Sequence, residues 1–195
     1  MPIKKHKSKQ AKKAKIKAEI KSLKNNITKL LDDAKVKYKV LEHKVVFTAH
    51  DVGATTKKKL SEIAKVVLVK TEYPSPRHGE GGPKGRERLM NESWALVVLP
   101  AGKYIDLKGV KKALKAKKVS IASEKDITKY LKTKVGLLHP FGSEYNIQTL
   151  LDKGMSKTKK IIASAGTYTD SVELGIKDFE KLVKPIKGVF SKARK

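Results

Sequence analysis

The sequence predicts an α/β (α+β) fold, with a single domain built on a mixed β-sheet flanked by helices. Short apolar runs rich in valine and isoleucine indicate strands, and between them apolar residues recur at steps of three and four, as on one face of a helix. Strands interleaved with helices are typical of this class. The 195 residues suffice for one domain with appended segments, and lysine-rich stretches lower the hydrophobic content to 39%.

The apolar run at residues 63–70 is the clearest strand. Its four central residues lie between Lys65 and Lys70, and three of the four are β-branched, which suits a pleated sheet. Alternation along a strand places Lys65, Val67 and Val69 on one face. Lys65 is therefore either a strand-end lysine whose ammonium reaches water, or a functional cation at the edge of an apolar face. The run alone leaves both interpretations open.

The remaining elements follow from the same patterns. Further strands are predicted at residues 36–41, 94–100, 119–122, 147–152, 160–166 and 171–176. Helices are predicted after Thr48, around Val110 and Leu114, at residues 124–131 behind a Ser123 cap, and between an Asp178 cap and Pro185. Residues 72–93, rich in glycine, proline and charge, are predicted to form a long exposed loop, and residues 185–195 a loose basic tail.

The charge of the chain predicts an anionic partner. Its formal net charge is +27, from 46 Lys and Arg against 19 Asp and Glu, which favours nucleic acid first and a membrane surface second. No apolar run is long enough to span a membrane, and the N-terminus has no apolar signal core. The absence of cysteine excludes disulfides, a thiol nucleophile and cysteine-ligated zinc. We expect a cytoplasmic protein with no membrane partner.

Residues 1–35 read as an N-terminal extension, a lysine-rich tail followed by an amphipathic helix. The apolar stripe of this helix consists of Ile16, Ile20, Leu23, Ile27, Leu30 and Leu31. Such a helix can lie on a membrane, bind a partner groove, or pack its stripe on its own domain and present its lysines to phosphates. The stripe contains no Trp or Phe to anchor it in lipid, so the last use is favoured.

Several short motifs occur in a definite order along the chain. They are Glu42-His43, residues 64–69, residues 97–102, residues 105–108, residues 121–124, residues 135–142, Leu151-Asp152 and residues 164–166. Together they resemble the YbaK/prolyl-tRNA synthetase-associated domain family of aminoacyl-tRNA deacylases over residues 36–184. The long loop at 72–93 and the basic N-terminal helix depart from the compact pattern of that family.

The resemblance implies a YbaK-like domain that hydrolyses the ester of mischarged tRNA, removing alanine, or as a second choice cysteine, from the tRNA for proline. It implies no cofactor and no metal, tRNA as partner, and an aminoacyl-tRNA synthetase as a second candidate partner. Lys65 matches the family's invariant lysine and is the expected catalytic residue. The substrate-binding candidates are His43, Gly136, His139, Pro140, Phe141, Gly142, Ser164 and Gly166. The tRNA-binding candidates are Lys12, Lys13, Lys17, Lys21, Lys24, Arg77, Lys84 and Arg86.

The chemistry of an ester hydrolase fits these residue types. The developing oxyanion needs donors, and Lys65 can hold the carbonyl or a phosphate and so orient the ester. We expect Gly136 to be glycine because the backbone approaches the ligand closely, so that a larger residue would block activity at little cost in stability. His139 is interpreted as a surface histidine rather than a base.

A second class of function stays open from the sequence. The same lysines would serve a catalytically silent, basic RNA-binding protein associated with a ribosome or a synthetase, because they attract phosphates without reading bases. Lys65 and the intact loop at residues 136–142 favour the enzyme. Hydrolysis of mischarged tRNA distinguishes the two.

Overall fold

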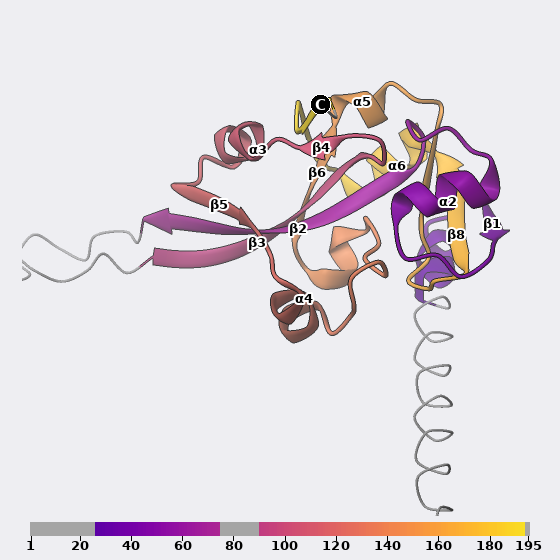
Figure 1. Ribbon diagram of the computed structural model, residues 1–195, viewed down its shortest axis with the longest axis horizontal. Coiled ribbons are helices and arrows are strands. Elements are labelled where there is room, and N and C mark those ends of the chain that lie inside the picture. Colours follow the sequence, from indigo (N-terminus) through magenta and orange to yellow (C-terminus); the bar gives the residue numbers. More distant parts are fainter. Residues whose placement is uncertain (1–25, 75–89, 194–195) are drawn as a thin grey trace, which may run out of the picture.

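The computed structural model describes residues 26–74 and 90–193 (Figure 1). A helix over residues 26–33 comes first. The strands are β1 Tyr38–Glu42, β2 Ala64–Pro74, β3 Met90–Pro100, β4 Tyr104–Ile105, β5 Lys118–Ile121, β6 Gln148–Asp152, β7 Lys160–Ser164, β8 Asp170–Gly175, β9 Ile186–Gly188 and β10 Ser191–Lys192. The helices are α2 Ala49–Thr56, α3 Leu107–Leu114, α4 Glu124–Leu131, the 3₁₀ turn Gly142–Tyr145, α5 Lys153–Ser156 and α6 Ile176–Val183.

The central sheet is mixed, which confirms the predicted fold class. Its strand order is β5-β2-β3-β6-β9. β2 pairs antiparallel with both β3 and β5, whereas β6 pairs parallel with β3 and β9. Lys65 lies opposite Leu99 of β3, next to the Ala64–Pro100 pair with which this ladder starts. Lys65 therefore stands at the open end of the β2–β3 hairpin.

A second, three-stranded sheet has the order β1-β8-β7 and is wholly antiparallel. The sequence pattern predicts these strands but does not separate them from the first sheet, because alternation reveals a strand and not its partner. The two sheets touch where Ile63, just before β2, forms a parallel bridge with Ile162 of β7. This contact sets the position of the site described below.

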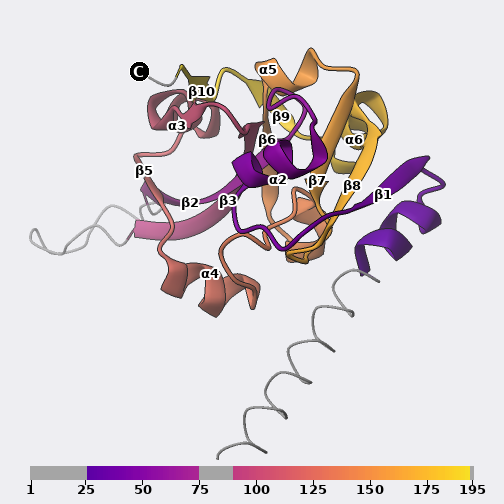
Figure 2. The ribbon, with the colours of Figure 1, turned by 45° about the vertical axis from the view of Figure 1, so that its right-hand side comes forward.

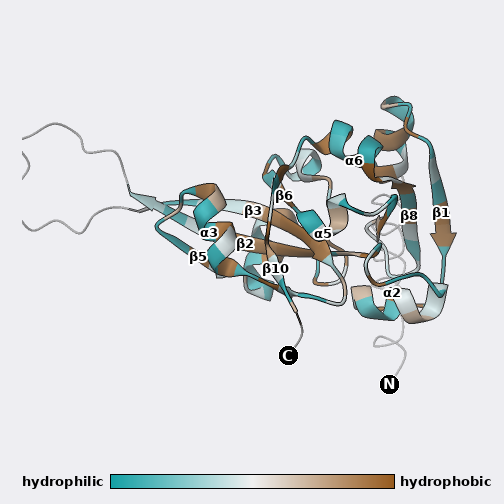
Figure 3. Cartoon of the chain, turned by 90° about the horizontal axis from the view of Figure 1, so that it is seen from above, coloured by the Kyte–Doolittle hydropathy of each residue, from teal (hydrophilic) through white to brown (hydrophobic). Residues whose placement is uncertain are grey.

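The two faces of the central sheet are covered by different helices, α3 on one side and α4 on the other (Figure 1). The face with Val69 packs on Val110 of α3, and the face with Leu68 packs on Ile127 of α4. Neighbouring residues of β2 thus enter opposite layers, as strand alternation requires. Figure 3 shows the apolar colouring concentrated on the central strands, with the outer helices mixed.

The helix over residues 26–33 packs on the domain beside β1 (Figure 2). Ile27 and Leu31 are buried in the same cluster as Phe179 and Leu174, and Tyr38 of β1 donates a hydrogen bond to Asp32 at 3.0 Å. The C-terminal part of the predicted apolar stripe therefore faces its own domain. Residues 1–25 lie outside the described part of the chain.

Three predicted boundaries are wrong. The β2–β3 ladder extends to the Pro74–Met90 pair, so residues 72–74 and 90–93 of the expected 72–93 loop belong to strands instead. Asp178 lies in the first turn of α6, whose N-cap is Gly175. The C-terminal segment is not loose through residue 192, because β9 and β10 pair with β6 and β4 and Phe190 is buried.

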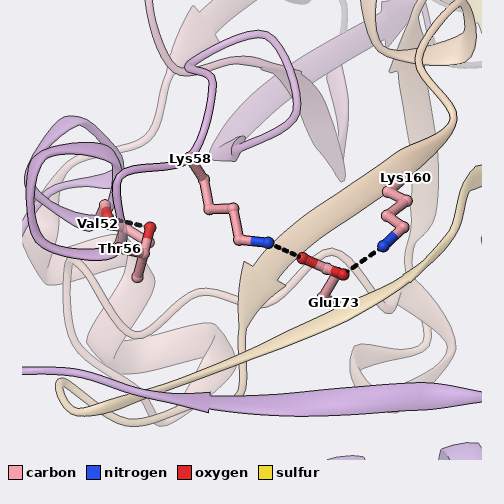
Figure 4. Close-up of polar contacts among 5 residues, drawn as sticks. All are labelled: Val52, Thr56, Lys58, Lys160 and Glu173. Atoms are coloured by element: carbon pink, nitrogen blue, oxygen red, sulfur yellow. Dashed lines mark hydrogen bonds and ion pairs between the residues drawn. The ribbon is translucent and has the colours of Figure 1, made fainter.

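Glu173 of β8 connects three segments of the chain (Figure 4). Its two carboxylate oxygens each lie 2.7 Å from an ammonium group, that of Lys160 at the start of β7 and that of Lys58 after α2. The hydrogen bond from Lys160, and after it the one from Lys58, hold the pKa of Glu173 below its ordinary value. The folded protein therefore favours the ionised carboxylate more than the unfolded chain does.

Glu173→Gln is expected to lower the free energy of unfolding near neutral pH. Because the folded-state pKa is depressed, the stabilisation is present above the unfolded-state pKa and is lost as pH falls through the folded-state pKa. Urea unfolding at several pH values should show the difference between variant and wild type shrinking below about pH 4. Glu92→Gln is the control, since its exposed pair with Lys70 is worth little. A difference that stays constant with pH would contradict this account.

Candidate active site

A gap in strand pairing creates the site. Along one edge β2 pairs with β3 over its whole length. Along the other edge, Ile63 is bridged to β7, and pairing resumes only where Ala122 donates to the Leu68 carbonyl at 3.0 Å and β5 begins. Within the described part of the chain, residues 64–67 therefore have a strand neighbour on one side only. β5 and β7 diverge from this point and leave space between them.

A cavity of about 430 Å³ fills this space. Its walls come from β2, from α2 and the segment before it, from the start of α4, and from the ends of β7 and β8. Most of these walls are apolar, with Val66 and Leu68 on one side and Val52 and Ile162 on the other. The volume lies within the range of small-ligand sites, which are concave and mainly apolar with a few placed polar groups.

Lys65 lines both this cavity and a second, smaller hollow. Its ammonium donates a hydrogen bond to the carbonyl of Lys103 at 2.7 Å and lies 5.4 Å from the centre of the Tyr104 ring. Both hollows share Thr48 and Ala49, at the start of α2. The simpler interpretation of Lys65, a strand-end lysine directed only at water, does not match this placement.

Polar side chains gather on one wall of the cavity. His43 Nε2 lies 3.0 Å from the hydroxyl of Ser171, and its Nδ1 lies 2.9 Å from the carbonyl of Lys44. If Nδ1 carries the proton toward that carbonyl, Nε2 accepts from Ser171. Ser171 is the cross-strand partner of Ser164, which also lines the cavity and accepts a hydrogen bond from the Gly166 amide at 3.1 Å.

Sequence reasoning missed two of the polar residues that line the cavity, Thr167 and Ser171. Thr167 is buried and donates to the Asp170 carboxylate at 2.8 Å, while the Asp170 amide donates back to its hydroxyl. This reciprocal pair shapes the tight turn between β7 and β8. The sequence does contain a signal for them, because polar residues directly precede the apolar residues of β8. A hydroxyl buried at such a place needs a hydrogen-bond partner, and neighbouring polar residues supply one.

Gly136 lines the cavity, but its backbone also requires glycine. Its φ is +86°, and a Cβ there would lie 2.7 Å from the carbonyl oxygen of Phe47. The expectation that a larger residue would block activity at little cost in stability is therefore wrong, because positive φ and a backbone clash strain any side chain.

Gly136→Ala is expected to lower the free energy of unfolding by on the order of 1–3 kcal/mol and to lower activity with it. Guanidinium unfolding and an assay of the ester hydrolysis that the family resemblance implies, on the same preparation, measure both. Gly102→Ala is the control for stability, since a Cβ there meets only Leu60 side-chain atoms at 3.6 Å. A Gly136→Ala protein of wild-type stability would show that the loop yields without strain.

The structure places the other predicted substrate-binding residues away from the cavity walls. These are His139, Pro140, Phe141, Gly142 and Gly166. Phe141 is fully buried against Phe179, and a Cβ on Gly142 would clash with the Ile147 carbonyl. Phe141 and Gly142 support the fold of the loop instead of forming the wall of the site, while Gly166 lies in the turn between β7 and β8, where its amide donates to Ser164.

His139 is buried, so its interpretation as a surface histidine is wrong. Its ring stacks on Tyr145 with centroids 4.3 Å apart, and burial lowers the pKa of His139 to about 3. A neutral imidazole in this position is part of the packing between the loop and the 3₁₀ turn. The predicted tRNA-binding residues at positions 12, 13, 17, 21, 24, 77, 84 and 86 all lie outside the described residues.

Comparisons with known proteins bear on this site. Residues 43–182 match the model of the aminoacyl-tRNA editing domain. The prolyl-tRNA editing protein ProX of Acetoanaerobium sticklandii is 27% identical over 158 residues, which cover 79% of this chain and 86% of that protein. No helix among the described residues is long and apolar enough to cross a membrane.

Two solved structures share the fold. A hypothetical protein superposes with a TM-score of 0.69 at 17% identity, covering 85% of this chain and 99% of the other. A protein described as a "putative trans-editing enzyme for prolyl tRNA synthetase" superposes with a TM-score of 0.67 at 14% identity, covering 88% and 98%. The segment that matches the family model spans β2, the cavity and the loop at residues 136–142. The chain belongs to the aminoacyl-tRNA editing domain family of hydrolases.

Proposed function

We propose that this protein is a trans-editing deacylase that hydrolyses the ester of mischarged tRNA for proline, with alanine as the first candidate amino acid and cysteine as the second. The observation that carries the proposal is the cavity onto which Lys65, Gly136, His43 and Ser164 converge. Family membership supports the ester chemistry, and the ProX relative supports the choice of tRNA.

The composition of the cavity walls favours a substrate amino acid whose side chain is small and uncharged. Apolar residues of β2 and β7 surround the enclosed part, and the described lining contains one carboxylate, Glu124, and one ammonium, Lys65. The volume of about 430 Å³ exceeds what an alanyl group needs, which leaves room for the terminal ribose of the RNA. The hydroxyls of Ser164 and Thr167 and the His43–Ser171 pair stand on the polar wall, where a ribose or an α-amino group would find partners.

Lys65 orients the ester in this proposal. Lys65 lines both the cavity and the second hollow, and its ammonium lies beside Lys103 and Tyr104 of that hollow, where the ester would pass from the enclosed aminoacyl group to the exposed RNA. A cation at this point stabilises the negative charge that develops on the carbonyl oxygen as water attacks. The backbone amide of Val66, at the unpaired edge of β2, supplies a further donor on the cavity side, whereas the amide of Val67 faces β3.

Hydrolysis of mischarged tRNA tests the proposal directly. Alanyl- and cysteinyl-tRNA for proline should lose their amino acid many times faster with the protein than in buffer, while correctly charged prolyl-tRNA is spared. A protein that binds all three and hydrolyses none would be the basic RNA-binding factor of the alternative function.

The N-terminal lysines are proposed to bind the tRNA body, with a synthetase as the other candidate partner. Deleting residues 1–24 removes these lysines and keeps Ile27 and Leu31, which belong to the core. Every phosphate that the shortened protein no longer neutralises should flatten the slope of log affinity against log salt by about 0.9. We therefore expect a flatter slope by several units and a higher KM for aminoacyl-tRNA, as measured by filter binding and steady-state kinetics.

A short aminoacyl-RNA mimic is the control substrate for this deletion. It reaches only the cavity, so its hydrolysis should stay close to that of the full chain. Binding to anionic vesicles distinguishes the membrane use of the helix, which predicts that the deletion abolishes vesicle binding and leaves tRNA affinity unchanged. An unchanged salt slope for tRNA would contradict the docking role.

A further inference from the structure

Positive charge is unevenly distributed among the helices of the domain. α3 contains Lys108, Lys111 and Lys112 and no acidic residue. α4 and α6 each contain two lysines balanced by two carboxylates. The high overall charge of the chain therefore does not account for α3 by itself, since helices of the same length on the same domain are neutral.

The lysines of α3 form its outer face. Val110, Ala113 and Leu114 pack inward on the cluster that contains Phe190. Lys108, Lys111 and Lys112 are exposed, and none of the ion pairs found among the described residues involves them. Further exposed lysines stand directly before and after the helix, namely Lys103, Lys115, Lys117 and Lys118, the last of which pairs with Glu72. We call this set the α3 surface.

The α3 surface begins at the second hollow beside Lys65. Lys103 and Tyr104 line that hollow, and Asp106 caps α3 two residues after Tyr104. The Tyr104 side chain is 47% exposed beside the Lys65 ammonium. A chain that leaves the cavity past Lys65 on this side therefore meets an aromatic ring first and a row of ammonium groups next.

The α4 side of the cavity is less suited to an anion. Beyond the cavity on the α4 side stand Glu124, which lines it, and Asp126, whose carboxylate accepts hydrogen bonds from the amide and hydroxyl of Ser123. Phosphates directed that way would meet a helix whose two lysines are balanced by two carboxylates, so α4 attracts them less than α3 does. The charge on the two sides of the central sheet thus gives the bound chain a direction.

We propose that the α3 surface binds the phosphate backbone of the RNA adjoining the aminoacylated end, with Tyr104 stacking on a base beside the site. This inference rests on the proposed function, because it concerns the same substrate. Exposed lysines neutralise phosphates and release counterions without reading sequence. An exposed aromatic ring next to cations is the usual platform for a single-stranded base. The α3 surface thus complements the N-terminal lysines by holding the end of the substrate close to Lys65.

The test removes the charge of α3 and compares it with an equal reduction of charge elsewhere. Lys108→Gln, Lys111→Gln and Lys112→Gln are combined in one full-length variant. The matched control combines Lys125→Gln and Lys129→Gln of α4 with Lys132→Gln at its C-cap, on the other face of the sheet. KM and kcat for alanyl-tRNA are measured at several salt concentrations, together with filter binding of uncharged tRNA and melting temperatures.

The α3 variant is expected to raise KM about tenfold with kcat nearly unchanged, and to flatten the salt slope by about 2 to 3, as expected when three lysines no longer neutralise phosphates. The α4 variant should change the salt slope by less than about 1. Tyr104→Leu should also weaken the binding of tRNA, whereas Tyr104→Phe should retain it because stacking needs only the ring. Equal effects of the α3 and α4 variants would overturn the proposal, since only general charge would then matter.

Failure of the proposed function gives a different result. If the wild-type protein hydrolyses no aminoacyl-tRNA but the α3 variant alone loses affinity for uncharged tRNA, RNA binding by the α3 surface is supported and the deacylase assignment is rejected. If the wild-type protein hydrolyses alanyl-tRNA and the α3 variant keeps its KM and salt slope, RNA binding by the α3 surface is rejected and the deacylase assignment is supported.

Discussion

Replacing Lys65 with alanine is expected to lower the rate of deacylation roughly 100-fold or more, the usual cost of removing one group that stabilises a developing oxyanion. Lys65 lines both the cavity and the second hollow, and its ammonium donates to the Lys103 carbonyl at 2.7 Å. That hydrogen bond holds the side chain over the hollow before the ester arrives. The decrease should appear in kcat, because the interaction with the carbonyl strengthens as charge develops.

Lys70→Ala is the matched control for this prediction. Lys70 lies on the same strand, but its ammonium pairs with Glu92 at the far end of the β2–β3 hairpin, away from the cavity. The Lys70→Ala protein should deacylate at the rate of the wild type and have a melting temperature within a few degrees of it. A Lys65→Ala protein that retains a rate within about threefold of wild type would remove the ammonium from the mechanism, since roughly 100-fold is the effect of removing a group that stabilises the transition state.

Phe190→Ala is expected to cost about 3–5 kcal/mol in the free energy of unfolding, as for other phenylalanines removed from cores. The ring is 1% exposed and packs in the cluster beneath α3, and its amide donates to Asp152 at 2.7 Å. The ring also lies against the backbone of Gly188, where a Cβ would clash with it. Removing it leaves a cavity at the edge of the central sheet that the neighbouring strands cannot fill.

Val189→Ala is the control, because its side chain is 60% exposed and a surface change of this kind stays within about 0.5 kcal/mol. Guanidinium unfolding of both variants measures the difference. If Phe190→Ala loses less than about 1 kcal/mol, residues 186–192 are not part of the cooperative core. This would restore the loose tail that the lysine-rich composition predicts.

The sequence predicts a loose tail around Phe190, but the structure buries this residue. Other features could be predicted from sequence because they depend on local patterns. Ser123 and Asp126 form the capping box that the pattern predicts, because a cap depends on residues three apart in the chain. β2 was predictable for the same reason, since β-branched residues favour a strand wherever it is placed. By contrast β9 is three residues long, and it is a strand only because β6 lies beside it. Its pairing is non-local and leaves no periodic signal.

The sequence by itself determined the fold class, the family and the choice of Lys65 as the candidate catalytic residue, because strand and helix periods and short ordered motifs are local properties of the chain. Only the tertiary structure decided which motif residues share the cavity. It brings Lys65, Gly136, His43 and Ser164 together and directs His139 and Phe141 into the core instead. The reason is the gap along β2 between β7 and β5, which depends on where two distant strands diverge. A contact between residues more than a hundred positions apart, such as His43 with Ser171, has no counterpart in spacing along the chain.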